Sequence, residues 1–286
     1  MENLLYLFLS VTLSAGRNIA SKKTAVYTNK KAQFFLSQTI IFASAALLLL
    51  LFCVNNRTEM AWITFVHGLA YGVLLISSQW MFTLALKNGN TSVCSVVYSL
   101  GFILPTVSGT LFWGEDFGFL QLIGVFVSVA IILLTAKKDG SEKKRGNRFS
   151  TPCILIAMIS SGGLGIMQKV QQSSAAANEK GVFLLVAFSF AFCCSLAAFL
   201  LFRERTAFTV HGFVYPVFTG LCFGGANLCN TVLAGKMRSA VFFPLQNMST
   251  ILLTALSGVF IYKEKLTLKT AVIIVLGMAV IIMFSL

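Results

Sequence analysis

The sequence predicts an all-α, polytopic membrane protein with ten transmembrane helices in two inverted five-helix repeats. Hydrophobic residues make up 57% of the 286 residues, and charged residues only 11%. A soluble protein usually carries charge on about a quarter of its residues, so the solvent of this chain is lipid. A second observation is a repeat, because Gly114-Glu115 closes one apolar segment and Lys263-Glu264 closes another in the second half of the chain.

Ten apolar segments are long enough to cross a bilayer. The hydrocarbon core is about 30 Å thick and an α-helix rises about 1.5 Å per residue, so each span needs roughly 20 residues. Short turns and one polar segment connect the spans, which leaves no room for an extramembrane domain. In chain order the predicted spans are 3–21, 32–54, 60–86, 91–113, 117–136, 152–171, 181–202, 211–235, 239–262 and 267–286.

The two halves of the chain carry matching residues at matching places. Ser108-Gly109 in the fourth span corresponds to Ser257-Gly258 in the ninth, at the same distance from the Glu that ends each span. We therefore predict one five-helix repeat at 1–136, a basic polar linker at 137–150 and a second repeat at 151–286. Five is an odd number, so the second copy enters the membrane from the opposite side to the first.

Basic residues gather at one end of the predicted spans. The formal net charge is +13, and sixteen lysines and arginines follow odd-numbered spans whereas five lie on the other side. The positive-inside rule then places the linker in the cytoplasm and both termini outside. Because this distribution explains the charge, we expect no nucleic-acid partner. His67 and His211 lie far apart and the seven cysteines form no Cys-x-x-Cys pair, so we expect no metal and no cofactor.

These patterns resemble the drug/metabolite transporter (DMT) superfamily, EamA type. Each repeat has two small or apolar residues at the end of one helix, a proline in the next helix, a Glu after it and a glycine in the last helix. The first copy is Ala85-Leu86, Pro105, Gly114-Glu115 and Gly124, and the second is Leu233-Ala234, Pro244, Lys263-Glu264 and Gly277.

The resemblance implies a transporter whose two inverted repeats enclose a cavity that opens to each side of the membrane in turn. It also implies cytoplasmic termini, which opposes the distribution of basic residues, so the orientation stays open. We expect an exporter of a small amphipathic organic metabolite, amino-acid-like or drug-like. We expect no enzyme activity, a multi-pass location in the bacterial plasma membrane, and lipid and a small-molecule substrate as partners; a homodimer is compatible with these features.

Polar residues in the middle of the spans are the candidates for solute binding. A polar group in lipid costs several kcal/mol unless it is paired, so such residues either bond neighbouring helices or line a wet cavity. Gln79 and Asn227 occupy matching positions in the two repeats, as do Tyr98 and Asn247. We predict cavity lining for these four and treat interhelical hydrogen bonding as the alternative. The full set of candidates is Arg17, Asn18, Gln79, Tyr98, Gln168, Asn227 and Asn247.

Arg17 is the candidate with a permanent charge. The family usually has a small residue at its position. Its predicted place near the end of the first span lets its side chain reach the interface, as Lys22 does. The alternative is that its guanidinium binds a carboxylate or phosphate through paired hydrogen bonds.

Prolines and glycines within the spans predict hinges and close helix packing. A proline inside a helix releases the carbonyl one turn earlier, which makes Pro105, Pro216 and Pro244 candidate hinges. Gly68-x-x-x-Gly72 and Gly220-x-x-x-Gly224 predict faces on which neighbouring helices approach closely.

The nine acidic residues all fall in turns or at span ends. A proton-driven antiporter generally needs a carboxylate within the membrane, so we expect transport without a proton-coupling carboxylate. Two alternatives remain. An intramembrane lipid-modifying enzyme would need acid/base or metal-binding acids, for which the chain offers Glu115-Asp116. A membrane assembly partner that transports nothing would bind no solute.

Overall fold

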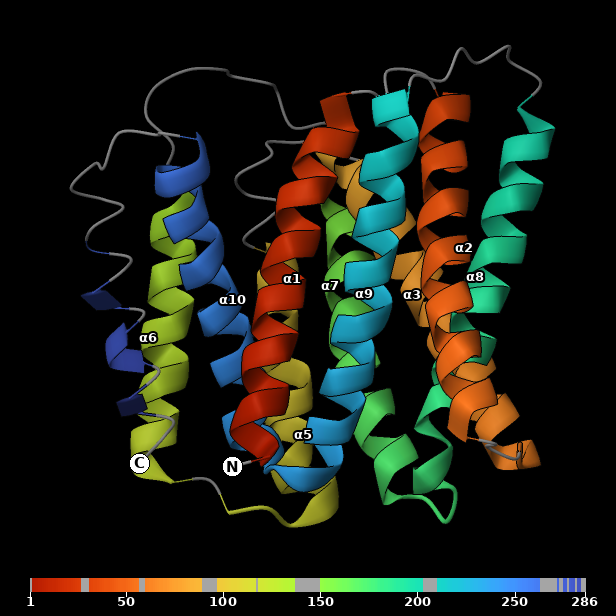
Figure 1. Ribbon diagram of the computed structural model, residues 1–286. Helices are drawn as coiled ribbons and strands as arrows, with labels where there is room; N and C mark the ends of the chain where they lie inside the picture. The colour runs from red at the N-terminus through yellow and green to blue at the C-terminus, as the bar shows by residue number, and fades with distance from the viewer. Residues whose placement is uncertain are drawn as a thin grey trace. The chain divides into compact units, whose positions relative to one another are not determined.

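In the computed structural model, all regular secondary structure of the described residues is helical (Figure 1). The structure describes residues 2–26, 31–56, 60–88, 97–116, 118–136, 150–202 and 210–262, with scattered positions between 272 and 283. Its helices are α1 (Glu2–Val26), α2 (Lys31–Asn56), α3 (Trp62–Asn88), η1 (Leu100–Phe102), α5 (Ile103–Trp113), α6 (Phe119–Ala136), α7 (Ser150–Ser173), η2 (Ala177–Glu179), α8 (Lys180–Leu201), α9 (Val210–Lys236) and α10 (Ser239–Tyr262).

The described helices match the predicted spans from the first to the ninth. The tenth span and the linker lie largely outside the described residues. Within the described residues, five helical segments are long and apolar enough to cross a membrane, and two shorter apolar segments cover 97–113 and 119–130. The all-α membrane class is therefore confirmed, while the inverted arrangement of the repeats stays a prediction. The five long segments are Lys31–Asn55, Trp62–Phe82, Pro152–Ser173, Ala177–Leu201 and Val210–Lys236.

The chain forms two compact units, and each unit takes segments from both predicted repeats. The first unit contains Met1–Val73 and Val170–Gly235, and the second contains Leu74–Lys169 and Lys236–Leu286. The chain passes from one unit to the other inside α3, inside α7 and at the end of α9. The compact units thus differ from the sequence repeats, whose boundaries at 1–136 and 151–286 remain a prediction.

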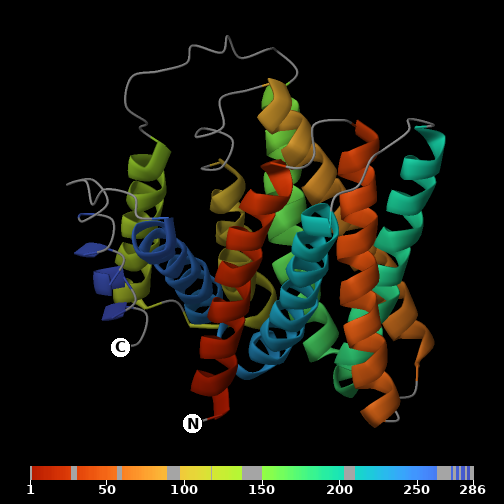
Figure 2. The same cartoon turned by 45° about the horizontal axis from the view of Figure 1, so that its top comes forward.

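In the first unit, α2 and α8 lie side by side in both views of the ribbon (Figures 1 and 2). The rings of Phe35 and Phe202 stack with centroids 5.3 Å apart, and those of Phe42 and Phe188 are 6.2 Å apart. Aromatic pairs at these distances add to the packing energy of the buried surface. They hold the middle and one end of this helix pair together.

Both predicted glycine faces in the first unit lie against another helix. A Cβ atom on Gly68 would lie 2.8 Å from the carbonyl oxygen of Phe183 in α8. A Cβ atom on Gly72 would lie 3.1 Å from the carbonyl oxygen of Ala187 in the same helix. On α9, a Cβ on Gly224 would lie 3.3 Å from the backbone of Ala45 in α2. These distances confirm the prediction of close packing, because only glycine allows backbones to approach so nearly.

The second unit contains a helix crossing of the same kind. A Cβ on Gly101 would lie 2.8 Å from the Met158 carbonyl oxygen of α7, and one on Gly162 would lie 2.6 Å from the Gly101 carbonyl oxygen. Gly101 belongs to the short 3₁₀ helix η1, which continues into α5. The irregular turn in the fourth span therefore sits directly on the backbone of α7.

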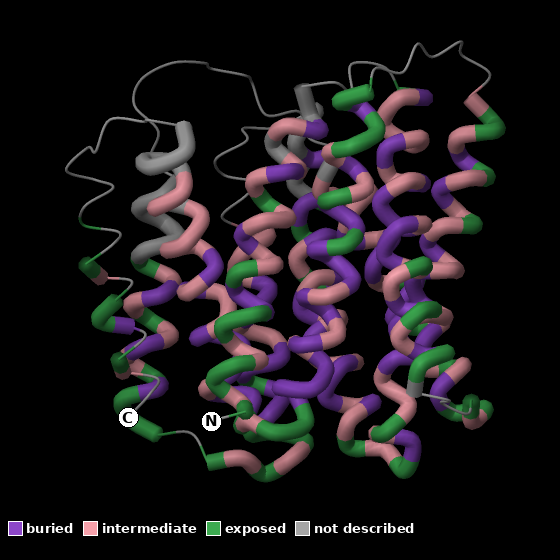
Figure 3. Tube along the Cα trace, viewed as in Figure 1, coloured by how far each residue is buried: buried purple, intermediate pink, exposed green. Residues whose placement is uncertain are grey.

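Buried and exposed positions alternate along the helices wherever side-chain burial is described, as expected when one face of a helix contacts its neighbours and another faces outward (Figure 3). The outward face of α2 is strongly apolar, with Leu47, Leu51 and Val54 exposed by 57%, 64% and 69%. Exposed leucines in such a row are unfavourable in water and favourable in lipid. The burial pattern therefore agrees with a bilayer as the surrounding medium.

The glycine packing of α9 on α2 predicts a specific effect of added methyl groups. A Cβ on Gly220 would clash with the backbone of Ile41, whereas one on Gly225 would meet only the end of the Leu13 side chain, at 3.0 Å. We expect Gly220→Ala to destabilise the protein by about 1–3 kcal/mol through overpacking. Gly225→Ala is the matched control on the same helix and should unfold near the wild-type temperature. Thermal unfolding of both variants in detergent measures the difference, and equal melting temperatures would contradict this packing.

Candidate functional site

Helix α9 carries polar side chains through its central turns in the first unit. Asn227 is only 7% exposed, and its Oδ1 accepts a hydrogen bond from the Tyr71 hydroxyl at 2.6 Å. Its Nδ2 donates to the Phe223 carbonyl at 2.8 Å. Three residues further on, Asn230 accepts a hydrogen bond from the Ser10 hydroxyl of α1. The amides of α9 thus connect this helix to both α1 and α3.

Arg17 of α1 meets the same face of α9. Its Cζ atom lies 3.6 Å from the centroid of the Phe223 ring, in cation–π contact. Phe223, Asn227 and Asn230 recur at the spacing that places helical residues on one face. This set is named the α9 polar cluster and consists of Ser10, Arg17, Tyr71, Phe223, Asn227 and Asn230.

The α9 polar cluster combines three chemical capacities in an apolar bundle. Arg17 offers a permanent positive charge, the two asparagines offer both donors and acceptors, and Phe223 and Tyr71 offer aromatic surface. A group with these capacities can bind a solute that has a polar end and an apolar body. The α1 and α9 helices approach closely beside it, since a Cβ on Gly16 would lie 3.4 Å from the Cys222 sulfur.

A second polar network in the first unit surrounds Gln171 near the end of α7. The Gln171 side chain is fully buried, and its Nε2 donates to the Ala176 carbonyl at 2.9 Å. Its Oε1 therefore faces the Nδ1 of His67, 2.7 Å away, which donates to it. The neighbouring Glu179 carboxylate accepts the backbone N–H of Ala61 at 2.8 Å, next to the start of α3. These bonds fix the turn between α7 and α8 to the beginning of α3.

In the second unit, two predicted site residues come together on the fourth and ninth spans. The hydroxyls of Tyr98 and Ser78 are 2.9 Å apart, and the Tyr98 ring lies 4.4 Å from that of Phe82. The Nδ2 of Asn247 in α10 donates to the carbonyl of Ser99, the residue after Tyr98, at 3.3 Å. The pair that the repeat predicted to be equivalent, Tyr98 and Asn247, is thus joined through adjacent backbone.

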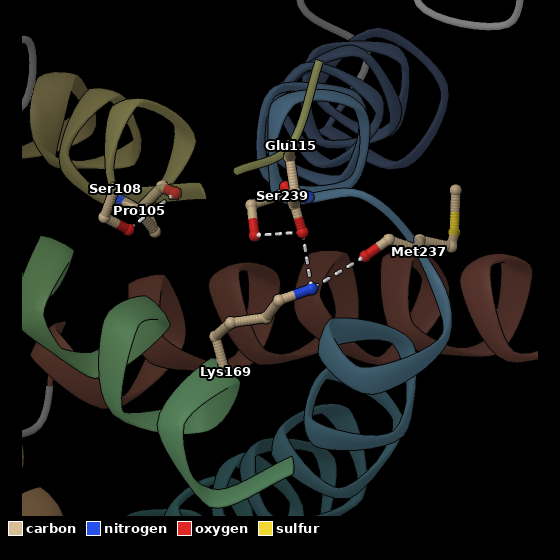
Figure 4. Close-up of polar contacts among 6 residues, drawn as sticks. All are labelled: Pro105, Ser108, Glu115, Lys169, Met237 and Ser239. Atoms are coloured by element: carbon tan, nitrogen blue, oxygen red, sulfur yellow. Dashed lines mark hydrogen bonds and ion pairs between the residues drawn. The ribbon is translucent and has the colours of Figure 1, made fainter. Parts of the chain in front are cut away.

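A mostly buried ion pair links three segments of the second unit (Figure 4). The Lys169 Nζ of α7 lies 2.7 Å from the Glu115 carboxylate, and both side chains are 11% exposed. The carboxylate accepts the backbone N–H of Ser239 at 2.5 Å and its hydroxyl at 3.4 Å. Lys169 also donates to the Met237 carbonyl at 3.4 Å. The acid therefore lies at the N-terminus of α10, where unpaired N–H groups and the helix dipole favour negative charge.

The local sequence explains why Glu115 turns back into the bundle. Gly114 ends α5 in the left-handed conformation with φ of 61°, which a residue without a side chain adopts at little cost. The Glu115 N–H then donates to the Gly109 carbonyl at 3.2 Å. Gly109 has no Cβ that would collide with the Glu115 carboxylate or with Ser239. The Gly-Glu pair found in the sequence is therefore a helix stop followed by an inward-pointing acid.

The other predicted site residues lie in different surroundings. Asn18 is exposed, Gln79 is half-buried and Gln168 is buried, and the three belong to α1, α3 and α7. Arg17 lies nearer the middle of its helix than the sequence suggested, because α1 continues to Val26 rather than ending near residue 21.

The three candidate hinge prolines differ in their helical context. Pro105 lies in the first turn of α5, just after the 3₁₀ turn, and is buried. The Ser108 hydroxyl donates to its carbonyl at 2.9 Å (Figure 4). Pro216 and Pro244 lie inside α9 and α10 without interrupting either helix. A hinge role for the three prolines stays a prediction.

Several residues of these networks are not among the candidates that the sequence provides. Ser10 and Asn230 look like ordinary small polar residues in apolar segments, and their pairing becomes visible only when α1 and α9 meet. In the sequence, Lys169 resembles an interface residue because Lys22 occupies the matching place in the first repeat. A basic residue near the end of a span, together with a recurring Glu elsewhere, is the signal that could have found the ion pair.

Comparison with known proteins agrees with this architecture. Residues 2–137 match the EamA-like transporter family, which confirms the resemblance seen in the sequence. A solved structure described as "Crystal structure of protein" superposes with a TM-score of 0.81 at 14% identity and covers 99% of this chain and 96% of that chain. At this identity the likeness shows the fold alone. No curated protein matches the chain.

The ion pair of the second unit predicts strong coupling between its two members. Removing one member of a buried pair leaves the other charge without its partner, which typically costs about 3–5 kcal/mol. We expect Glu115→Gln and Lys169→Met each to lower stability in SDS titrations of the detergent-solubilised protein, and the double variant to lose less than the sum. Arg238→Met, at an exposed position in the adjacent turn, is the control. Additive losses would contradict a direct interaction.

Proposed function

We propose that this chain, whose residues 2–137 match the EamA-like transporter family, exports a small amphipathic organic metabolite from the bacterial cell. The family match implies membrane transport; the type of solute and the direction are the proposal. The α9 polar cluster supports it, because a cation, two amides and aromatic rings meet in the middle of an otherwise apolar helix bundle. Polar residues at this depth are expensive and usually functional.

We propose alternating access as the mechanism. Two inverted repeats allow a site between them to be reached from either face by equivalent movements. The 3₁₀ turn Leu100–Phe102 before Pro105 supports a hinge in the fourth span, since a 3₁₀ stretch within a longer helix often marks one. Pro216 and Pro244 are the corresponding candidates in α9 and α10.

Interhelical bonding alone is the competing explanation of the polar residues. Hydrogen bonds between membrane helices contribute about 1 kcal/mol or less, and Asn227 with Tyr71 has the geometry of such a bond. A structural bond would affect protein yield, whereas a solute contact would affect flux at unchanged yield. The two explanations are therefore separable by experiment.

The export proposal is tested by the metabolites of cells that lack or overproduce the protein. We expect at least one small organic compound to accumulate inside the deletion strain and outside the overproducing strain. Flux of that compound into proteoliposomes then measures transport directly. Unchanged metabolite pools in both strains, with the protein present in the membrane, would contradict export.

Replacing the amides identifies their contribution to flux. We expect Asn227→Ala and Gln79→Ala to lower transport of that compound by roughly tenfold, equivalent to ~1.4 kcal/mol, at nearly normal membrane yield. Asn55→Ala, an exposed amide near the end of α2, is the chemically matched control and should transport normally. If both amide variants transport like wild type, these residues do not contact the solute.

Transport is proposed to need no proton gradient. The Glu115 carboxylate is bonded to Lys169 and to the start of α10, so its contacts in the structure join three segments of the second unit. We expect a pH gradient alone to drive no uphill accumulation in proteoliposomes, while a solute gradient drives exchange. Accumulation under a pH gradient would overturn this proposal, and His67→Gln would then show whether the histidine bonded to Gln171 carries the proton.

A further inference from the structure

We propose that the transported solute carries a carboxylate and that Arg17 binds it beside the Phe223 ring. This inference rests on the proposed transport function and specifies the chemical class of the solute. Its basis is the depth of the Arg17 guanidinium in the first unit and its stacking on the aromatic ring. Neither feature is explained by a charge that merely marks the end of a membrane span.

The depth of Arg17 follows from the two helices that meet there. Ser14 is the middle residue of α1, and Arg17 lies three residues beyond it, about 4.5 Å along the axis. Phe223 is the middle residue of the 27-residue helix α9. Helix α9 is long and apolar enough to cross a membrane, and the hydrocarbon core extends about 15 Å to either side of the bilayer centre. We therefore infer that a contact at the middle of α9 lies within the hydrocarbon core.

The side-chain direction increases this depth. Side chains on an α-helix lean towards its N-terminus, so the Arg17 side chain leans back towards Ser14 and away from the nearer helix end. A snorkelling arginine would extend the other way. Lys23 lies closer to the end of α1, and its Nζ is 5.2 Å from the ring of Tyr215 near the start of α9. Its charge is therefore near the helix ends, whereas that of Arg17 is near the helix centres.

The stacked geometry suits a carboxylate. A guanidinium that lies on a ring presents one flat face to it, while its N–H groups point outward in its own plane. A carboxylate can accept two parallel hydrogen bonds from that edge. The surrounding Phe223 and Cys222 are buried and apolar, which penalises a doubly charged phosphate more than a singly charged carboxylate.

A charge in this position also explains the composition of the cluster. Asn227 lies one turn from Phe223 and its Oδ1 is oriented by the Tyr71 hydroxyl at 2.6 Å. The buried Phe223 ring supplies apolar surface directly beside the Arg17 guanidinium. The inferred solute is therefore an organic acid with an apolar or aromatic body.

The test compares three probes that share a phenyl body and differ in the polar group. They are 3-phenylpropionate, its neutral amide 3-phenylpropionamide, and phenyl phosphate. Wild-type protein in proteoliposomes should take up the carboxylate at least tenfold faster than the other two. Arg17→Gln should remove this preference, and Lys23→Gln should keep it. Arg17→Lys should retain part of it, because charge remains while the planar pair of donors is lost.

The outcomes distinguish this inference from the proposed function. If the amide is carried as well as the acid, if phenyl phosphate is preferred, or if Arg17→Gln keeps the preference, the carboxylate assignment is overturned while transport stands. If wild-type protein changes neither the flux of any probe nor the cellular metabolite pools, the transport proposal itself fails. Should Arg17→Gln not fold, Phe223→Leu replaces it, and the wild-type selectivity among the three probes remains decisive.

Discussion

The need to pair every polar group in a hydrocarbon environment governs this structure. Water satisfies exposed polar groups in a soluble protein, but a polar side chain in the middle of a membrane helix must find its partner on another helix. Asn227 does so through Tyr71, and Asn230 does so through Ser10. These bonds determine which faces of α1, α3 and α9 meet.

Such pairing requires backbones to come close, and glycine makes this possible. The glycines of α3 lie against carbonyls of α8, and Gly224 lies against Ala45 of α2. In the second unit, Gly101 and Gly162 bring the 3₁₀ turn against α7. The same crossing places α7 where Lys169 reaches Glu115. Small residues therefore allow the short distance between neighbouring helices, and polar side chains form hydrogen bonds and ion pairs across that distance.

Most of the fold but only part of the site could be predicted from the sequence, for a physical reason. Apolar segments and glycine spacings are local features, so the positions of the helices up to the ninth predicted span, and the glycine faces, follow from the order of residues alone. The partner of Ser10 could not be predicted in this way, because its bond joins segments more than two hundred residues apart. The Glu115–Lys169 pair likewise joins the residue that follows the end of α5 to the separate helix α7. The repeat did identify Tyr98 and Asn247 as related positions. In the structure, Asn247 donates a hydrogen bond to the carbonyl of Ser99, the residue that follows Tyr98.

Arg17 shows how charged residues can mislead an estimate of helix length. The apolar run ends before Lys22 and Lys23, which suggests a span that stops near residue 21. Lysine side chains are long enough to reach the interface from within a helix, so the helix can continue past the apolar run. It does continue, to Val26, and this moves the centre of α1 towards Arg17. The same residue therefore lies near the middle of its helix rather than near its end, and there its guanidinium stacks on the Phe223 ring.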